Sequence, residues 1–491
     1  MKLVISLLLL LSSSILIAGP WIPVGDQWLR SEIEFLSNRG VIKAPITTWP
    51  IMWTNIRQDM EQALIPKNFK KLSKREQSTL LRIKAEFNKH TSNTKSYGVE
   101  ISSSTRVFRD FIDSPREEFS LFYQQQYMTD HFAYNLDVTY SNDPFVALNQ
   151  KEQALRYDGS YIAGVFGNIS YGYGWIDKWW GPGWNSSLIL SNNARPRPSL
   201  FLKRNSSDMF ESDWLRWIGP WTIEGFVSLL NDERFVSNAK LLGMSIAFKP
   251  THNIEVGLRR TAQWGGDGRP QDISTLVDLF LGRDNCGSSG ISDCGVENSN
   301  EPGNQLAGLD VKWNIPSIES SVYMQMMGED EADYFPSRRT YLLGASGTYN
   351  LNDDLLTYII EASDTTTNFG DRYDYTYNHF LYRTGYRYFN RSIGSTLDND
   401  GKYYTLKLIY SSEEYKLSMS YTSFDVNVDD SGQNNSISNN SLTTDALEFN
   451  FAHNTAIGDF DYTIILNDSG YDSKFGQNSN FMAQLRWTNT F

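Results

Sequence analysis

The sequence predicts a transmembrane β-barrel of about 18 antiparallel strands, preceded by a small N-terminal α-helical bundle. Three observations lead to this prediction. After the N-terminus no apolar run approaches the ~20 residues of a membrane-spanning helix, although 14% of the 491 residues are aromatic. Apolar and polar residues alternate over many short segments, as expected for strands with one apolar face. Short polar connections interleave with long ones, which is typical of outer-membrane barrels.

The first residues are typical of a secretory signal peptide. Lys2 precedes an apolar stretch from Leu3 to Leu11, and the small residue Ala18 stands directly before Gly19. The apolar core is too short for a spanning helix, so a retained anchor or a buried N-terminal strand is the weaker alternative. We therefore expect residues 1–18 to be removed and the mature protein to leave the cytoplasm.

Residues 19–96 are predicted to form the helical bundle, because three segments place apolar residues at helical spacing. The three apolar faces are Leu29, Ile33 and Leu36; Ile56, Met60 and Leu64, within a helix over about Trp53–Leu64; and Leu80, Ile83 and Phe87. Gly40 can cap the first helix at its C-terminus. Pro66 should stop the second helix, and Ser73 with Glu76 forms a capping box that starts the third.

Net charge distinguishes this bundle from the rest of the chain. Residues 19–96 carry a net charge of +6 and residues 97–491 carry −20, which with Lys2 gives −13 for the whole chain. The strongly acidic charge of residues 97–491 argues against nucleic acid as a partner.

From residue 97 onward the period of the apolar pattern changes to two. The clearest apolar row is Phe132, Tyr134, Leu136, Val138 and Tyr140, with polar or small residues between its members. At ~3.3 Å per residue and a tilt of ~40°, this row covers ~20 Å of membrane, close to the band between the aromatic girdles of an outer-membrane barrel. Such rows indicate about eleven strands from Leu241 to Phe491 and about seven before them, hence 16 to 18 strands.

The lengths of the connections assign the two ends of the barrel. Tight turns are expected near Lys249–Asn253, Asn350–Asp354 and Ser411–Glu414, and long polar segments lie at 265–304, 364–402 and 423–445. Outer-membrane barrels have short periplasmic turns and long extracellular loops, so we expect the long segments to be extracellular. The stretch from Phe424 to Asn440 is so polar that it should be solvated.

The two cysteines of the chain, Cys286 and Cys294, lie in an Asn/Ser/Gly-rich part of the first long segment. In an oxidising compartment they are expected to form one disulfide. This bond would either pre-organise a binding surface or protect the loop against proteases, and the sequence leaves both alternatives open. The five histidines are scattered, so no metal site and no cofactor are expected.

No enzyme motif stands out. The sequence contains no nucleophile elbow, no His-Glu-x-x-His, no phosphate-binding glycine-rich loop and no nucleotide fingerprint. The acidic run Glu329-Asp330-Glu331 could in principle supply the two carboxylates of a glycosidase, but such runs are more often solvated. We therefore expect a protein that is not an enzyme.

Two segments suggest carbohydrate binding. Residues 179–184 read Trp-Trp-Gly-Pro-Gly-Trp and lead into an Asn- and Arg-containing stretch, while Gln263–Pro270 combines tryptophan, glycine and arginine. Tryptophan can stack on sugar faces, and Asn and Arg can donate to hydroxyls and carboxylates. The predicted contacts are Trp180, Trp184, Asn193, Arg195, Trp264 and Arg269. Alternatively, the tryptophans are girdle or packing residues around a tight Gly-Pro-Gly turn.

These segments, together with Leu36–Ile42, Thr48–Pro50, Asn304–Gly308 and Gly328–Glu331, resemble the capsule assembly Wzi family of Gram-negative bacteria. The resemblance implies an eighteen-stranded outer-membrane barrel whose periplasmic mouth is occluded by the helices. It also implies an outer surface that acts as a lectin for capsular or extracellular polysaccharide, assisting capsule assembly. Many barrels holding one repeating polymer would gain avidity from weak sites. Polysaccharide and outer-membrane lipid are the expected partners, and the barrel is expected to be a monomer.

Two questions stay open at this stage. An acidic body fits an acidic capsule poorly unless Arg195, Arg197, Arg204, Arg269 or Arg283 forms a local positive patch. The competing hypothesis is a porin or sugar-uptake channel in which the helices form a removable plug.

Overall fold

The computed structural model describes residues 21–491 except 142–145, 148–149, 152, 281–302, 333–334, 352–353, 414 and 432–434. The predicted signal peptide, the predicted Cys286–Cys294 disulfide and Arg283 lie outside the described residues. In the part of the chain that is described, no helix is both long and apolar enough to cross a membrane.

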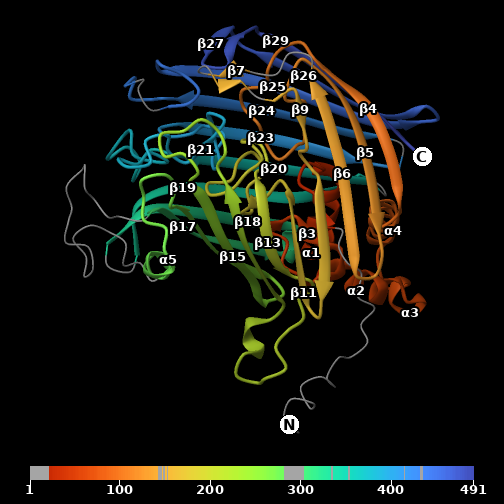
Figure 1. Ribbon diagram of the computed structural model, residues 1–491. Helices are drawn as coiled ribbons and strands as arrows, with labels where there is room; N and C mark the ends of the chain where they lie inside the picture. The colour runs from red at the N-terminus through yellow and green to blue at the C-terminus, as the bar shows by residue number, and fades with distance from the viewer. Residues whose placement is uncertain are drawn as a thin grey trace.

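The described residues form a closed antiparallel barrel of 18 strands (Figure 1). The barrel strands are β4 (Thr94–Ser102), β5 (Phe119–Met128), β6 (Phe132–Ser141), β10 (Tyr161–Phe166), β11 (Ile169–Trp175), β13 (Pro198–Arg204), β14 (Trp221–Leu229), β15 (Lys240–Thr251), β16 (Ile254–Trp264), β17 (Gly303–Ile315), β18 (Ser320–Ala332), β19 (Phe335–Leu351), β20 (Asp354–Asp364), β23 (Lys402–Ser411), β24 (Lys416–Val426), β25 (Leu442–Thr455), β26 (Gly458–Asn467) and β29 (Phe481–Thr490). The barrel closes because β29 pairs with β4, and β6 pairs with β10. The predicted fold and strand number are confirmed.

Shorter elements are not part of the 18-stranded wall. They are β1 (Trp21–Ile22), β2 (Thr48–Trp49), β3 (Ile51–Met52), β7 (Val146–Ala147), β8 (Gln150–Lys151), β9 (Leu155–Arg156), β12 (Trp179–Trp180), β21 (Arg387–Tyr388), β22 (Arg391–Ser392), β27 (Tyr471–Ser473), β28 (Gly476–Asn478), α5 (Ile273–Phe280) and the 3-10 helices η1 (Arg216–Ile218) and η2 (Pro316–Ile318). Of these, β9 extends the sheet by pairing with the end of β6.

The period-two pattern of the strands separates a lipid-facing row from a luminal row. On β13, Leu200 and Leu202 are exposed, whereas Phe201 and Lys203 between them are buried. The same alternation on β6 exposes Phe132, the first member of the row from which the strand was predicted. Apolar side chains outside and polar ones inside are what a barrel in a bilayer requires.

The two ends of the barrel differ in their connections. At one end, the turn end, short connections join β5 to β6, β10 to β11, β15 to β16 and β23 to β24. The three predicted tight turns lie here, as do the start of β4 and the end of β29. The opposite end, the loop end, carries the three long segments. One connection breaks this pattern, because the long segment 205–220 joins β13 to β14 at the turn end.

The N-terminal part contains four helices: α1 (Gln27–Asn38), α2 (Trp53–Leu64), α3 (Pro66–Phe69) and α4 (Lys74–His90). The capping box of Ser73 and Glu76 is present at the start of α4. Gly40 follows α1 with φ +71° and donates to the Ser37 carbonyl at 3.0 Å. The sequence predicted three helices, and the fourth is the short α3, which Pro66 begins after ending α2.

The helices fill the lumen and the turn end (Figure 1). Every residue of α1 is buried, and its apolar face packs with those of α2 and α4. Charged pairs tie the helices to the wall: Arg75 lies 2.5 Å from Glu319 and Lys89 lies 3.2 Å from Asp459. The basic helical part and the acidic barrel therefore meet through complementary charges.

The prediction that Phe424–Asn440 is solvated is wrong for much of its described part. Val426, Asn435 and Ile437 are buried. The Asn435 amide donates to the carbonyl of Asn399 at 2.8 Å. A polar segment can be buried in this way because its polar atoms find partners on a neighbouring loop.

Candidate functional site

The Trp-Trp-Gly-Pro-Gly-Trp motif lies inside the barrel, not on its surface. Strand β12 pairs with β2, with Trp179 opposite Trp49. The side chains of Trp180 and Trp184 are 0% and 1% exposed. The motif and the residues on both sides of it form residues 176–197, which we call the luminal segment.

Two side chains of the wall hold this segment. Glu361 accepts hydrogen bonds from the backbone N–H groups of Trp184 at 2.7 Å and Asn185 at 2.8 Å. Gln325 donates to the Trp180 carbonyl at 2.7 Å and accepts from the backbone N–H of Leu188 at 2.9 Å. Because backbone groups buried away from water need partners, these contacts let an irregular segment cross the lumen.

The tryptophan rings pack against protein groups. The Arg30 guanidinium lies 4.0 Å from the Trp184 ring centroid, and the Trp180 and Phe226 ring centroids are 5.5 Å apart. A polysaccharide outside the barrel cannot reach either ring, so the structure does not support the sugar contacts predicted for Trp180 and Trp184. Burial agrees instead with the packing alternative.

Asn193 and Arg195 are also engaged within the protein. The Asn193 amide donates to the Ser392 carbonyl at 2.9 Å. Arg195 binds Asp158 with two hydrogen bonds of 3.0 Å. Burial alone would raise the pKa of Asp158, but the charge and hydrogen bonds of Arg195 outweigh it and hold that pKa below its usual range.

Three of the arginines considered for a positive patch, Arg195, Arg197 and Arg204, do not form one at the loop end. Arg195 is paired with a carboxylate, Arg197 is buried, and Arg204 ends β13 at the turn end. Arg269 is half-buried at the loop end, as is the predicted contact Trp264 at the end of β16. Of the six predicted contacts, only these last two lie on the surface of the loop end.

A cap formed by residues 365–401 covers the luminal segment from the loop end. Ser191 donates its backbone N–H to the Ile393 carbonyl at 3.0 Å, and the Tyr377 hydroxyl donates to the Leu188 carbonyl. Tyr382 and Tyr386 are buried in the same core. The predicted outer loop thus folds inward, and its aromatic residues pack over the lumen.

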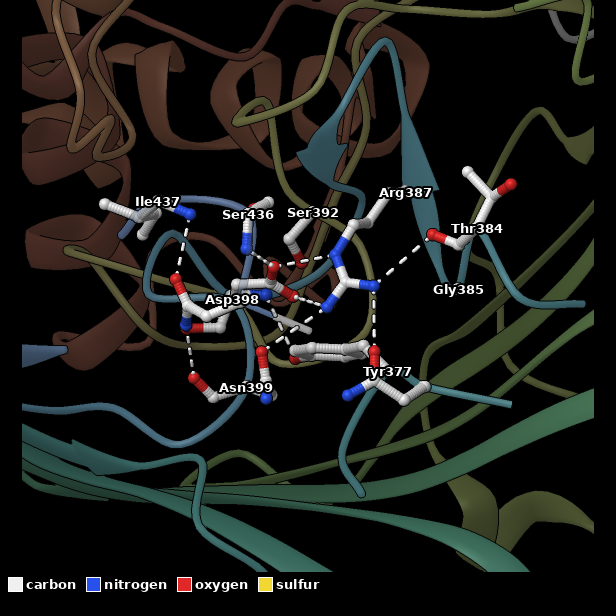
Figure 2. Close-up of polar contacts among 12 residues, drawn as sticks. Tyr377, Thr384, Gly385, Arg387, Ser392, Asp398, Asn399, Ser436 and Ile437 are labelled. Atoms are coloured by element: carbon white, nitrogen blue, oxygen red, sulfur yellow. Dashed lines mark hydrogen bonds and ion pairs between the residues drawn. The ribbon is translucent and has the colours of Figure 1, made fainter. Parts of the chain in front are cut away.

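An ion pair within the cap is hydrogen-bonded to the next loop (Figure 2). Arg387 donates to the two carboxylate oxygens of Asp398 at 2.7 and 2.9 Å. Asp398 also accepts from the backbone N–H of Ser436 at 2.7 Å. Both charged side chains are nearly inaccessible to solvent, so the bidentate geometry and the additional hydrogen bond offset their desolvation.

Two exposed aromatic side chains and an arginine meet at the loop end. We call Phe235, Phe380 and Arg383 the aromatic face; Arg383 donates to the Phe380 carbonyl at 3.4 Å. Phe235 is 60% exposed and Phe380 48%. The Arg383 guanidinium lies 4.7 Å from the Phe235 ring centroid, and the backbone N–H of Phe235 donates to the Thr384 hydroxyl at 2.8 Å. The face therefore joins the β14–β15 connection to the cap.

Sequence reasoning did not select these residues. The segment 364–402 was predicted only to be an outer loop. The signal that it carries is the tyrosines and phenylalanines that occur throughout it. Which of them are buried and which are exposed depends on how the cap folds.

Residues 88–458 match the family model described as capsule assembly protein Wzi. The chain belongs to this family.

Two similar proteins give the match its context. An uncharacterized 55.8 kDa protein from the cps region of Klebsiella pneumoniae is 32% identical over 348 residues, which cover 70% of this chain but only 65% of that protein's length. The structure of Wzi from Escherichia coli is described as a carbohydrate-binding β-barrel of the outer membrane involved in group 1 capsule assembly. It superposes with a TM-score of 0.83 at 25% identity, covering 96% of this chain and 100% of that one.

Membership of the Wzi family places the barrel in the outer membrane, with its loops at the cell surface. Because outer-membrane barrels have short turns on the periplasmic side, the turn end faces the periplasm. The loop end, with the cap and the aromatic face, faces the cell exterior.

A cavity of about 460 Å³ lies in the lumen between the wall and the luminal segment. It extends from Lys89 and Thr490 near the turn end to Asp158 and Arg156. Its lining holds more carboxylates than cationic side chains and does not include a residue of the cap. Among the described residues, helices cover the lumen at the turn end and the cap covers it at the loop end, with this cavity between them.

Proposed function

We propose that this chain is a surface lectin, not an enzyme, that attaches capsular or extracellular polysaccharide to the outer membrane. The observation that carries the proposal is the aromatic face at the loop end of a Wzi family barrel. The similar barrel from Escherichia coli is described as carbohydrate-binding, and we extend that role to this chain.

The chemistry of the face suits a sugar polymer. Aromatic rings offer flat apolar surfaces for the apolar faces of sugar rings. Arg383 beside Phe235 presents a planar set of donors for hydroxyl or carboxylate groups. This arginine, and not Arg195 or Arg204, supplies local positive charge at the face of an acidic protein.

The cap pre-organises this face. The residues that the cap contributes to the face belong to a segment fixed by the buried Arg387–Asp398 pair. Tyr377, Tyr382 and Tyr386 in the core also fix this segment. A rigid surface loses little conformational entropy on binding. Each barrel can still bind weakly, because a long polymer engages many barrels at once.

The test is binding of the host's own polysaccharide to purified protein in detergent, measured by co-sedimentation. We expect Phe235→Ala and Phe380→Ala each to weaken binding. Phe166→Ala is the matched control, since Phe166 is 81% exposed but lies at the turn end. If wild-type protein bound no polysaccharide, or if all three variants bound as well as wild type, the proposed site would be wrong.

A deletion strain tests the cellular role. Loss of an attachment protein should leave total polymer normal and shift it from the cell-bound fraction into the medium. An unchanged partition would argue against attachment and favour the channel hypothesis.

A further inference from the structure

The connection 205–220 is unusual for the turn end. The neighbouring turns at this end are short, whereas this connection contains η1 and projects at the lower edge of Figure 1 as a yellow-green loop. It exposes large apolar side chains: Trp214 is 75% exposed, Trp217 62% and Met209 54%. Apolar groups of this size in water mark an interaction surface.

The base of the connection is well fixed. Arg204 donates to the carbonyls of Trp221 at 2.7 Å and Asp208 at 2.9 Å. The backbone N–H of Trp221 donates to the Ser207 carbonyl at 3.0 Å. The exposed tryptophans are therefore presented by an ordered loop and are not part of a loose chain.

The connection continues the lipid-facing surface of the barrel. Arg204 follows Leu200 and Leu202 in the outward row of β13, and Trp221 begins the outward row of β14. The Phe210 ring stacks on Trp221, with centroids 4.6 Å apart and an interplanar angle of 12°. The aromatic side chains of the connection thus extend the apolar outer surface of the wall at its periplasmic edge.

We propose that residues 205–220 form a membrane-interface anchor, in which Trp214 and Trp217 insert into the lipid headgroup region of the periplasmic leaflet. Tryptophan is enriched at this depth because its ring is apolar while its N–H needs a polar partner. Glu211, Asp213 and Arg216 are exposed between the apolar side chains, where they meet headgroups and water. The proposal rests on the outer-membrane location and does not depend on the polysaccharide role.

Spin labelling of the protein in vesicles of phosphatidylethanolamine and phosphatidylglycerol tests the depth of the two tryptophans. Trp214→Cys and Trp217→Cys are labelled with a nitroxide in a background with both natural cysteines replaced by serine. Leu202→Cys is the lipid-facing reference, and Asp130→Cys, in the short turn between β5 and β6, is the aqueous reference. Folding of each variant is checked by its shift in gel mobility on heating.

We expect collisions with oxygen to exceed those with a water-soluble nickel chelate at positions 214 and 217, as at 202. Equal access to the nickel chelate at 214, 217 and 130 would overturn the proposal. Loss of access to both reagents would also overturn it, because the loop would then be covered by a second copy of the chain.

A second measurement does not depend on the labels. Brominated lipids quench the fluorescence of tryptophans that lie within the membrane. If Trp214 and Trp217 are inserted, the fraction of fluorescence that these lipids quench should fall in the double variant Trp214→Ser/Trp217→Ser. The double variant Trp180→Phe/Trp184→Phe is the control, since both rings are buried in the lumen. An unchanged quenched share in the first variant would contradict insertion.

Discussion

The carboxylate of Glu361, on the barrel wall, accepts a hydrogen bond of 2.7 Å from the backbone N–H of Trp184 in the lumen. It also accepts from the backbone N–H of Asn185 and from the hydroxyls of Tyr323 and Tyr403. One buried side chain thereby joins the luminal segment to three strands of the wall, β18, β20 and β23.

Replacing Glu361 should destabilise the barrel. Glu361→Ala leaves four buried donors without this acceptor, and each buried polar group left unpaired costs roughly 1–3 kcal/mol. Glu361→Gln should cost less than Glu361→Ala, because its amide oxygen still accepts hydrogen bonds. It should still be less stable than wild type, because its NH2 group faces donors that need an acceptor. The free energy of unfolding in urea, followed by tryptophan fluorescence, measures both. The control is Glu413→Ala, in an exposed turn, which should have the same free energy of unfolding as wild type. If Glu361→Ala were as stable as this control, Glu361 would not stabilise the barrel.

Gly181 should not tolerate a side chain. Its φ is +149°, and a Cβ there would lie 2.5 Å from the Gln325 amide nitrogen. Gln325 cannot move aside without losing its bonds to Trp180 and Leu188. We expect Gly181→Ala to lower the yield of refolded barrel, measured by gel mobility. Gly268→Ala is the control, because its φ is also positive, at +75°, but nothing lies within 4 Å of its Cβ. Equal yields for the two variants would show that crowding at Gln325 has no effect.

The Arg387–Asp398 pair should hold the cap closed. Breaking a buried pair by removing one partner costs about 3–5 kcal/mol, so Arg387→Met should increase hydrogen exchange across residues 365–401 and weaken polysaccharide binding. Arg387→Lys should be intermediate, since the lysine ammonium keeps the charge but lacks the planar pair of donors that matches the two carboxylate oxygens. Arg372→Met, at an exposed site in the same segment, should leave exchange unchanged. Normal exchange in Arg387→Met would mean that the pair does not order the cap.

The stability of the cap should depend on pH through Asp400. Burial raises the pKa of Asp400 to about 7, against the hydrogen bonds that it accepts from the Asp374 backbone and the Asn399 amide. The folded state then binds more protons than the unfolded state between about pH 4 and pH 7. Stability from this group is therefore present at low pH and is lost as the pH rises through 7.

Hydrogen exchange of the cap, corrected for its intrinsic pH dependence, measures this effect. Protection should fall from pH 5 to pH 8 in wild type and change less in Asp400→Asn, which carries no charge. Parallel pH profiles for the two proteins would exclude Asp400 as the cause.

Conductance distinguishes the lectin from the channel. Intact protein in a planar bilayer is expected to show no steady current, because the helices fill the turn end and the cap covers the loop end. Deletion of residues 21–92 should open the turn end and allow current, with folding of the variant checked by gel mobility. Substantial steady conductance in the intact protein would favour the porin hypothesis.

The sequence by itself determined the barrel, a range of 16 to 18 for its strand number, and three of its four N-terminal helices. These features follow from local patterns: the period of two in rows such as Phe132–Tyr140, the helical spacing of Leu29, Ile33 and Leu36, and the capping box at Ser73. Each pattern is set by backbone geometry over a few residues, so it can be recognised without knowing the distant contacts.

The tertiary structure alone decided where the functional side chains lie. The sequence left open whether Trp180 and Trp184 contact sugar or pack within the protein; in the structure, Glu361 and Gln325 from distant strands bind the backbone around them in the lumen. The polar segment near Asn435 is buried because Asn399 and Asp398 supply its partners. Whether a polar or aromatic residue is buried depends on partners far away in the chain. Local patterns do not contain that information, so only the folded barrel separates the luminal core from the exposed aromatic face.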